Sequence, residues 1–79
     1  MSTFFKFGFS YYKIDLAAGY YEQVNQAPDS TSFAKVTNNT AVTGLNNASI
    51  ANANQKFEAI TEVQYNEVKN QVKTTLNSL

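Results

Sequence analysis

The aromatic residues of this chain are crowded into its first quarter, and their spacing limits what that segment can form. Eight of the eleven Phe and Tyr residues come before residue 22. Between residues 4 and 14 they recur at alternate positions, which is the repeat of a β-strand. The pattern predicts one long strand over residues 3–14, with a uniformly aromatic face made by Phe5, Phe7, Phe9 and Tyr11.

Adjacent aromatic residues constrain the fold further, because neighbours in a strand point to opposite faces of the sheet. Three such doublets occur, Phe4-Phe5, Tyr11-Tyr12 and Tyr20-Tyr21. One helix covers only one face of a small sheet, and a large exposed apolar patch usually marks an interface. Three interpretations follow. The outer face packs on copies of the chain or on a larger partner, the N-terminal strand folds over to close both faces within one chain, or the aromatic side chains meet lipid or stack on sugars.

Two more strands are expected after the aromatic segment. Residues 15–19 are typical of a hairpin connection in which Gly19 supplies a positive φ, and residues 20–25 form the next strand. Pro28 and Asp29 favour a turn within residues 26–30, and a shorter strand is expected over residues 32–37. These segments make an aromatic-rich β region over residues 3–37.

The connector over residues 38–55 is rich in Asn and Ala and carries no charge. A structureless loop of this length is uncommon in a compact domain unless it has a function or is disordered. A helix over residues 45–55 is one alternative, since Leu45, Ala48 and Asn52 would share a face. An arm that packs on a partner is another, and the sequence leaves helix, loop and arm open.

The C-terminal segment, residues 56–79, contains the clearest local signals. A short strand is expected over residues 56–60. Thr61 and Gln64 have the spacing of a capping box, and Ile60 and Tyr65 that of a hydrophobic staple. Two independent rules therefore start a helix at the same place, and we predict a helix over residues 62–77.

The apolar stripe of this expected helix is narrow, and consists of Tyr65, Val68, Val72 and Leu76. A narrow stripe is typical of a coiled-coil seam, which two or three subunits could share. The alternative is that the stripe packs on the chain's own sheet. We therefore predict two contact surfaces for partners, the aromatic strand face and this stripe.

Composition excludes several classes of protein. The 79 residues are enough for one small domain, residues 1–79. Cysteine and histidine are absent, so neither a disulfide nor a structural zinc site is expected. The six lysines balance six acidic residues, which argues against nucleic-acid binding. No apolar run is long enough for a membrane-spanning helix. No secretion signal is apparent, so the virion or the cytoplasm is the expected location.

The side chains that usually perform catalysis are also scarce. The chain has no His, Cys or Arg, its glycines are isolated, and no phosphate-binding loop is present. Glu58 and Glu62 would lie one turn apart if both were on one helix, which could imitate an acid–base pair. The preferred interpretation is that one closes a strand and the other opens a helix. We therefore expect no enzyme activity, no cofactor and no small-molecule substrate.

Three short segments resemble small structural modules of bacteriophage virions, associated with capsids or fibres. They are Tyr11-Tyr12-Lys13-Ile14-Asp15, then Phe57-Glu58-Ala59-Ile60-Thr61 leading into Tyr65-Asn66-Glu67-Val68-Lys69. This resemblance covers about a third of the chain and transfers no functional residue. It implies a structural component of a virion.

The sequence as a whole predicts an α+β domain with a three- to four-stranded, mainly antiparallel sheet and one C-terminal helix. The expected function is that of a non-enzymatic structural or interaction protein in an oligomeric assembly, with itself or a larger assembly as partner. The alternative is a small monomeric inhibitor or regulator that binds a single host protein.

Overall fold

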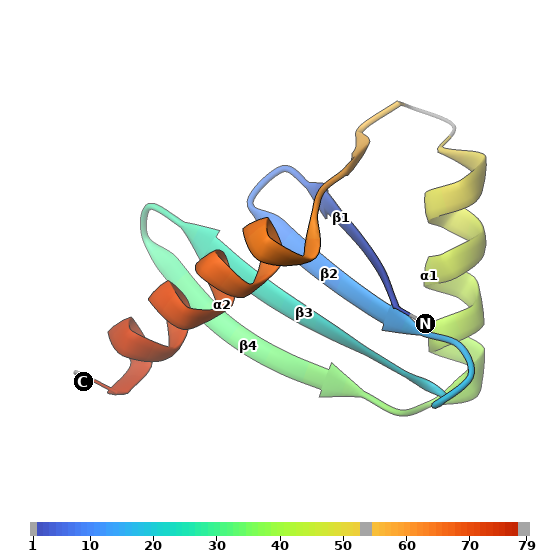
Figure 1. The fold of residues 1–79 in the computed structure, drawn as a ribbon, viewed down its shortest axis with the longest axis horizontal. Helices are drawn as coiled ribbons and strands as arrows, with labels where there is room; N and C mark the ends of the chain where they lie inside the picture. Colours follow the sequence, from blue (N-terminus) through green and yellow to red (C-terminus); the bar gives the residue numbers. More distant parts are fainter. Residues whose placement is uncertain (1, 53–54, 78–79) are drawn as a thin grey trace.

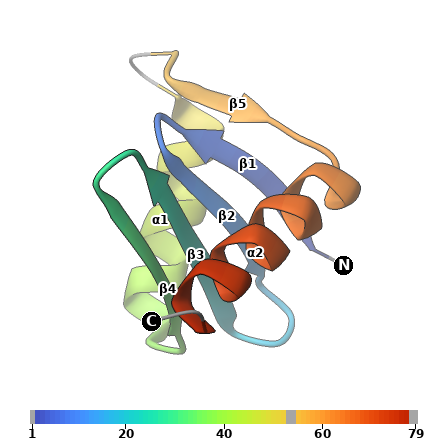
Figure 2. The ribbon, with the colours of Figure 1, turned by 90° about the vertical axis from the view of Figure 1, so that its left-hand side faces the viewer.

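The computed structural model describes residues 2–52 and 55–77, and shows an antiparallel sheet with a helix against each face (Figures 1 and 2). The elements in chain order are β1 (Thr3–Phe7), β2 (Ser10–Asp15), β3 (Tyr20–Ala27), β4 (Ser30–Val36), α1 (Asn39–Ala51), β5 (Phe57–Ala59) and α2 (Glu62–Asn77). The strands lie in the order β4-β3-β2-β1-β5. The α+β class is confirmed. The described residues form five strands and two helices, so the expectation of three to four strands and one helix is wrong in detail.

The single long strand predicted over residues 3–14 is wrong. The chain turns at Gly8 and Phe9, and β1 pairs with β2 so that Phe7 lies opposite Ser10. Gly8 has a φ of +60°, which glycine adopts without strain in a tight hairpin turn. Alternating aromatic residues on either side of a two-residue turn look like one strand in the sequence. The turn reverses which face each later residue occupies.

The next two connections agree with the sequence. β2 ends at Asp15 and β3 begins at Tyr20, and Gly19 between them has a φ of +75°. Its amide donates to the Asp15 carbonyl at 2.9 Å, and the Asp15 carboxylate accepts from the Ala18 amide at 2.9 Å. Pro28 and Asp29 form the turn between β3 and β4. The hairpin and turn predictions are therefore confirmed, although β3 and β4 are each longer than expected.

The uncharged connector forms helix α1, which begins six residues before the helix considered in the sequence. The Asn38 side chain caps its N-terminus by accepting from the Ala41 amide at 3.1 Å. Asn52 ends it in a left-handed conformation, with φ 45°. The Asn52 side chain also donates to the Phe57 carbonyl and accepts from the Phe57 amide, at 3.1 and 3.0 Å. Asn38 and Asn52 thus fix the two ends of α1, and Asn52 also connects the helix to β5. Residues 53–54 lie outside the described residues.

Helix α2 begins and ends where the sequence predicts, at Glu62 and Asn77. Both bonds of the capping box are present. The Gln64 amide donates to the Thr61 hydroxyl at 3.1 Å, and the Thr61 amide donates to the Gln64 side-chain oxygen at 2.9 Å. Ile60 packs on the same core as Tyr65, as a hydrophobic staple requires.

A helix covers each face of the sheet (Figure 2), and each face has its own core. Buried residues under α2 are Val24, Tyr65 and Val72. Buried residues on the α1 side are Phe5, Ile14 and Val42. Five of the six doublet residues, all but Tyr20, therefore pack in a core within one chain. Helix α1 is the second cover, in place of a folded-over N-terminal strand.

Candidate functional site

The four residues predicted to share one aromatic face are divided by the β1–β2 turn. Phe5 and Phe7 lie on the α1 face of the sheet, Tyr11 lies on the α2 face, and Phe9 is in the turn itself. Phe5 is buried, with its ring 5.2 Å from the Tyr12 ring in a stacked arrangement. The prediction of one uniform face is wrong because it depended on one continuous strand.

The helix stripe lies on the chain's own sheet. Tyr65 and Val72 are completely buried against Val24. Val68 and Leu76 are partly buried and pack on the same cluster. This is the second of the two alternatives left open for the stripe. Tyr65 and Val72 are therefore not accessible to a partner in this structure.

Two accessible aromatic residues lie at or beside the β1–β2 turn, and a third, Phe33, lies in β4. Phe9 is 60% exposed and Phe7 is 37% exposed. The Phe7 ring contacts the ring of Phe57 in β5, with 4.8 Å between the centroids. We call Phe7 and Phe57 the tip cluster, because they lie in contact beside the β1–β2 turn.

A groove continues from the tip cluster along α1. It has a volume of about 250 Å³, and its walls come from β1, β5 and the C-terminal half of α1. Phe57 lines it together with Ile50, which is 75% exposed. Tip cluster and groove therefore form one apolar strip through Phe7, Phe57 and Ile50. Of these three residues, only Phe7 was predicted from the sequence to be a contact residue. Phe57 was missed because it reaches β1 through long-range strand pairing.

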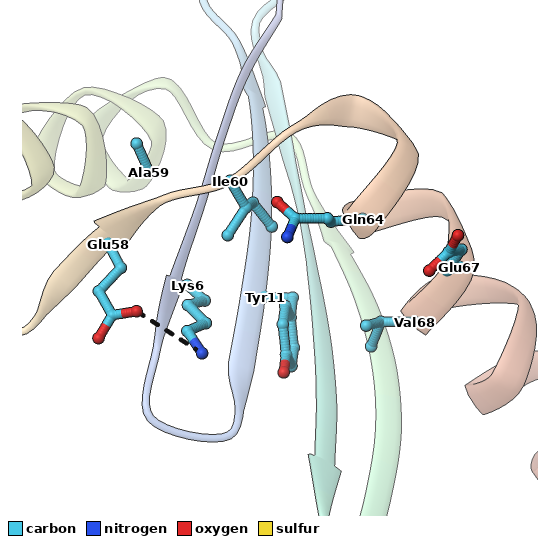
Figure 3. A pocket seen from close by; sticks show the side chains of 8 residues that line it. All are labelled: Lys6, Tyr11, Glu58, Ala59, Ile60, Gln64, Glu67 and Val68. Carbon is cyan, nitrogen blue, oxygen red and sulfur yellow. Dashed lines mark ion pairs between the residues drawn. The ribbon is translucent and has the colours of Figure 1, made fainter.

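A second hollow, of about 310 Å³, lies between β5, β1 and the start of α2 (Figure 3). The Lys6 ammonium lies 3.6 Å from the Glu58 carboxylate, and both side chains are substantially exposed. Figure 3 shows Glu67 on the opposite side of the hollow from Glu58. Glu58 lies in β5 and Glu62 is the first residue of α2, as the preferred interpretation held. The hollow pairs one carboxylate with one lysine and does not bring two carboxylates together.

The densest polar contact is buried under α2 and was missed in the sequence. Glu22 in β3 is only 8% exposed. Its carboxylate accepts from the Tyr65 hydroxyl and from the Lys69 ammonium, each at 2.9 Å. The only local sign of this network in the sequence is that Tyr65 and Lys69 are one helical turn apart. Glu22 is more than forty residues from both, so its part in the network could not be predicted.

The protonation states of this network follow from its surroundings. Burial alone would raise the pKa of Glu22, but hydrogen bonds from Lys69 and Tyr65 and the charges of Lys69 and Lys13 together lower it below 4.5. Burial, and then the Glu22 carboxylate, raise the pKa of the Tyr65 hydroxyl well above its ordinary value. The network therefore holds an ionised carboxylate against a neutral phenol and a lysine, and its clearest effect is to fix α2 on the sheet.

Other kinds of site were also considered. The described residues contain no group of three or more acidic, His or Cys side chains able to hold a metal ion. None of the described helices is both long and apolar enough to cross a membrane. Comparison with models of protein families, with curated proteins and with solved structures gave no match. The apolar strip is therefore the candidate functional surface.

Proposed function

We propose that this protein is a non-enzymatic subunit of an oligomeric assembly and that the apolar strip is one of its contact surfaces. The observation that supports this is the exposure of aromatic and aliphatic side chains beside one another: Phe7 against Phe57, and Phe57 and Ile50 along one groove. Aromatic residues are enriched in protein interfaces, where they contribute a large contact area with few rotatable bonds.

The core on the α1 face is already filled by other side chains, which leaves these residues exposed. That core contains Phe5, Tyr12 and Tyr21 on the same face of the sheet. Helix α1 contributes one buried residue, Val42, and leaves Ile50 near its C-terminus 75% exposed. Burial of the strip in a second protein surface would gain about 25 cal/mol per Å² of apolar area, less the cost of ordering the partners.

The most specific form of this proposal is a component of a bacteriophage virion. It depends on the resemblance of Tyr11–Asp15, Phe57–Thr61 and Tyr65–Lys69 to virion modules. The partner is then a second copy of the chain or a larger capsid or fibre protein, and the location is the virion or the cytoplasm of the infected cell.

Light scattering over a dilution series tests the proposal. We expect the wild-type chain to have a mass of at least twice 8.8 kDa, and Phe7→Asp to lower that mass. Leu16→Asp is the matched control, because Leu16 is 53% exposed in a different turn. Circular dichroism checks that both variants are folded.

Two results would overturn the proposal. An equal loss of mass in Phe7→Asp and Leu16→Asp would mean that the strip has no specific role. A monomer at every concentration would instead favour the alternative, a small inhibitor or regulator whose groove beside α1 binds one host protein.

A further inference from the structure

The two edges of the sheet are protected to different extents. β5 is an edge strand of three residues, and short edge strands offer little to an incoming strand. β4 is the other edge, and has seven residues without a proline or a glycine. No strand of the described chain pairs with its outer side, and Figures 1 and 2 show it at the border of the sheet.

The strand register identifies the backbone groups of β4 that face outward. The Gln26 amide donates to the Phe9 carbonyl at 2.9 Å, so the backbone of Gln26 faces β2 and not β4. Gln26 lies opposite Thr31, which makes this a pair without hydrogen bonds between the two strands. Because the pattern alternates, Thr31, Phe33 and Lys35 direct their amides and carbonyls away from β3.

We infer that β4 pairs antiparallel with β4 of a second copy, around a two-fold axis at Phe33. This inference rests on the proposed function, since it names one contact of the assembly. In this register Phe33 faces Phe33 of the partner subunit, and Thr31 faces the partner's Lys35. All seven residues of β4 are then paired, and the three outward residues of each chain exchange hydrogen bonds.

Side-chain chemistry favours the register centred on Phe33 over the one centred on Lys35. Phe33 is 36% exposed, so pairing would remove apolar surface from water on both copies. A shift that placed Lys35 opposite its own copy would oppose like charges, which is destabilising. On the α1 face the strand presents Ser32 and Ala34, which are small enough not to obstruct a partner. The strand is therefore complementary to itself, as a two-fold contact requires.

Disulfide trapping tests the register, and the chain contains no cysteine to interfere. Ser32 would face the partner's Ala34 in a pair without hydrogen bonds, where Cα atoms are about 4.5 Å apart. The same residue on the two copies would be about 7–8 Å from itself, too far for a disulfide. Mild oxidation of mixed Ser32→Cys and Ala34→Cys proteins should therefore give a linked dimer, and each variant alone should not.

The trapping experiment can contradict the inference in a defined way. A linked dimer from Ser32→Cys alone would place the two-fold axis at Ser32, and one from Ala34→Cys alone would place it at Ala34. Either result would contradict the register centred on Phe33. Failure to link in all three samples, at concentrations where the protein is oligomeric, would exclude β4 pairing while leaving the proposed function intact. Linking that persists in a Phe7→Asp background would support β4 pairing as a contact separate from the apolar strip.

A charge exchange at the axis gives a second measurement that does not require oxidation. Phe33→Lys alone and Phe33→Glu alone place like charges opposite each other and should lose the β4 contact. An equimolar mixture of the two should restore it, because lysine then faces glutamate. Only a contact in which residue 33 of one copy faces residue 33 of the other would be restored by mixing. If the mixture has the same solution mass as each variant alone, the inference is contradicted.

Discussion

The two faces of the sheet are stabilised in different ways. Under α2, the buried Val24, Tyr65 and Val72 form the core. Beside it, Glu22 of β3 is bound by the Tyr65 hydroxyl and by a partly buried ion pair with Lys69. Under α1, most of the core comes from the strands themselves, through the Phe5–Tyr12 and Phe5–Phe57 ring contacts. Helix α1 adds only Val42 to the buried set. One face depends on a helix fixed by specific bonds, and the other on aromatic contacts with a lightly attached helix.

The largest loss of stability is expected from a substitution that breaks the polar network on the α2 face. Lys69→Met leaves the mostly buried Glu22 without its cation, and the loss of this charged hydrogen bond should cost about 3 kcal/mol. Urea unfolding at neutral pH measures this loss. Lys73→Met is the control on the exposed side of the same helix, and should change the free energy of unfolding by less than about 0.5 kcal/mol. Similar losses in both variants would mean that the network contributes nothing specific.

A matched pair of core truncations compares the two faces directly. Val72 and Val42 are both buried, one on each helix. Val72→Ala should cost about 2–3 kcal/mol, from the lost apolar transfer and the remaining cavity. Val42→Ala should cost about 1–2 kcal/mol, because α1 is held at few points and can move to fill the space. Equal losses, measured by the urea midpoint, would show that α1 is packed as rigidly as α2.

The α2 face should also respond to pH. The lowered pKa of Glu22 contributes stability that is present above pH 4.5 and is lost as the pH falls through the lower folded value. The raised pKa of Tyr65 contributes stability that is present below pH 10.0 and is lost as the pH rises toward the raised value. Urea midpoints across pH 3–7 measure the acid effect, and the slope should be smaller in Glu22→Gln. An unchanged slope in that variant would assign the acid effect to other carboxylates.

The smallest expected effect concerns the helix caps. Thr61→Ala and Asn38→Ala each remove a side-chain acceptor from a helix N-terminus, and each should cost about 1 kcal/mol. Thr61→Ala should cost the more of the two, because Thr61 and Gln64 also form the reciprocal bond of the capping box. Thermal unfolding compares the two variants. No change in Thr61→Ala would show that tertiary packing alone positions the start of α2.

The sequence by itself determined the features that depend on neighbouring residues. Gly19, Pro28 and Asp29 mark their turns, and Thr61 and Gln64 mark the start of α2, because each acts through bonds to backbone within a few positions. Local patterns gave the wrong prediction at Gly8. The turn there looks like part of a strand because the alternation of aromatic residues resumes immediately after it.

Only the tertiary structure decided what depends on the order of the strands. Antiparallel pairing of β5 with β1 brings Phe57 to Phe7 and creates the apolar strip. Packing of α2 across β3 brings Tyr65 and Lys69 to Glu22, and the strand order leaves β4 as a free edge. These contacts join residues up to fifty positions apart, and no local pattern records them, because their energy appears only when the whole sheet is formed.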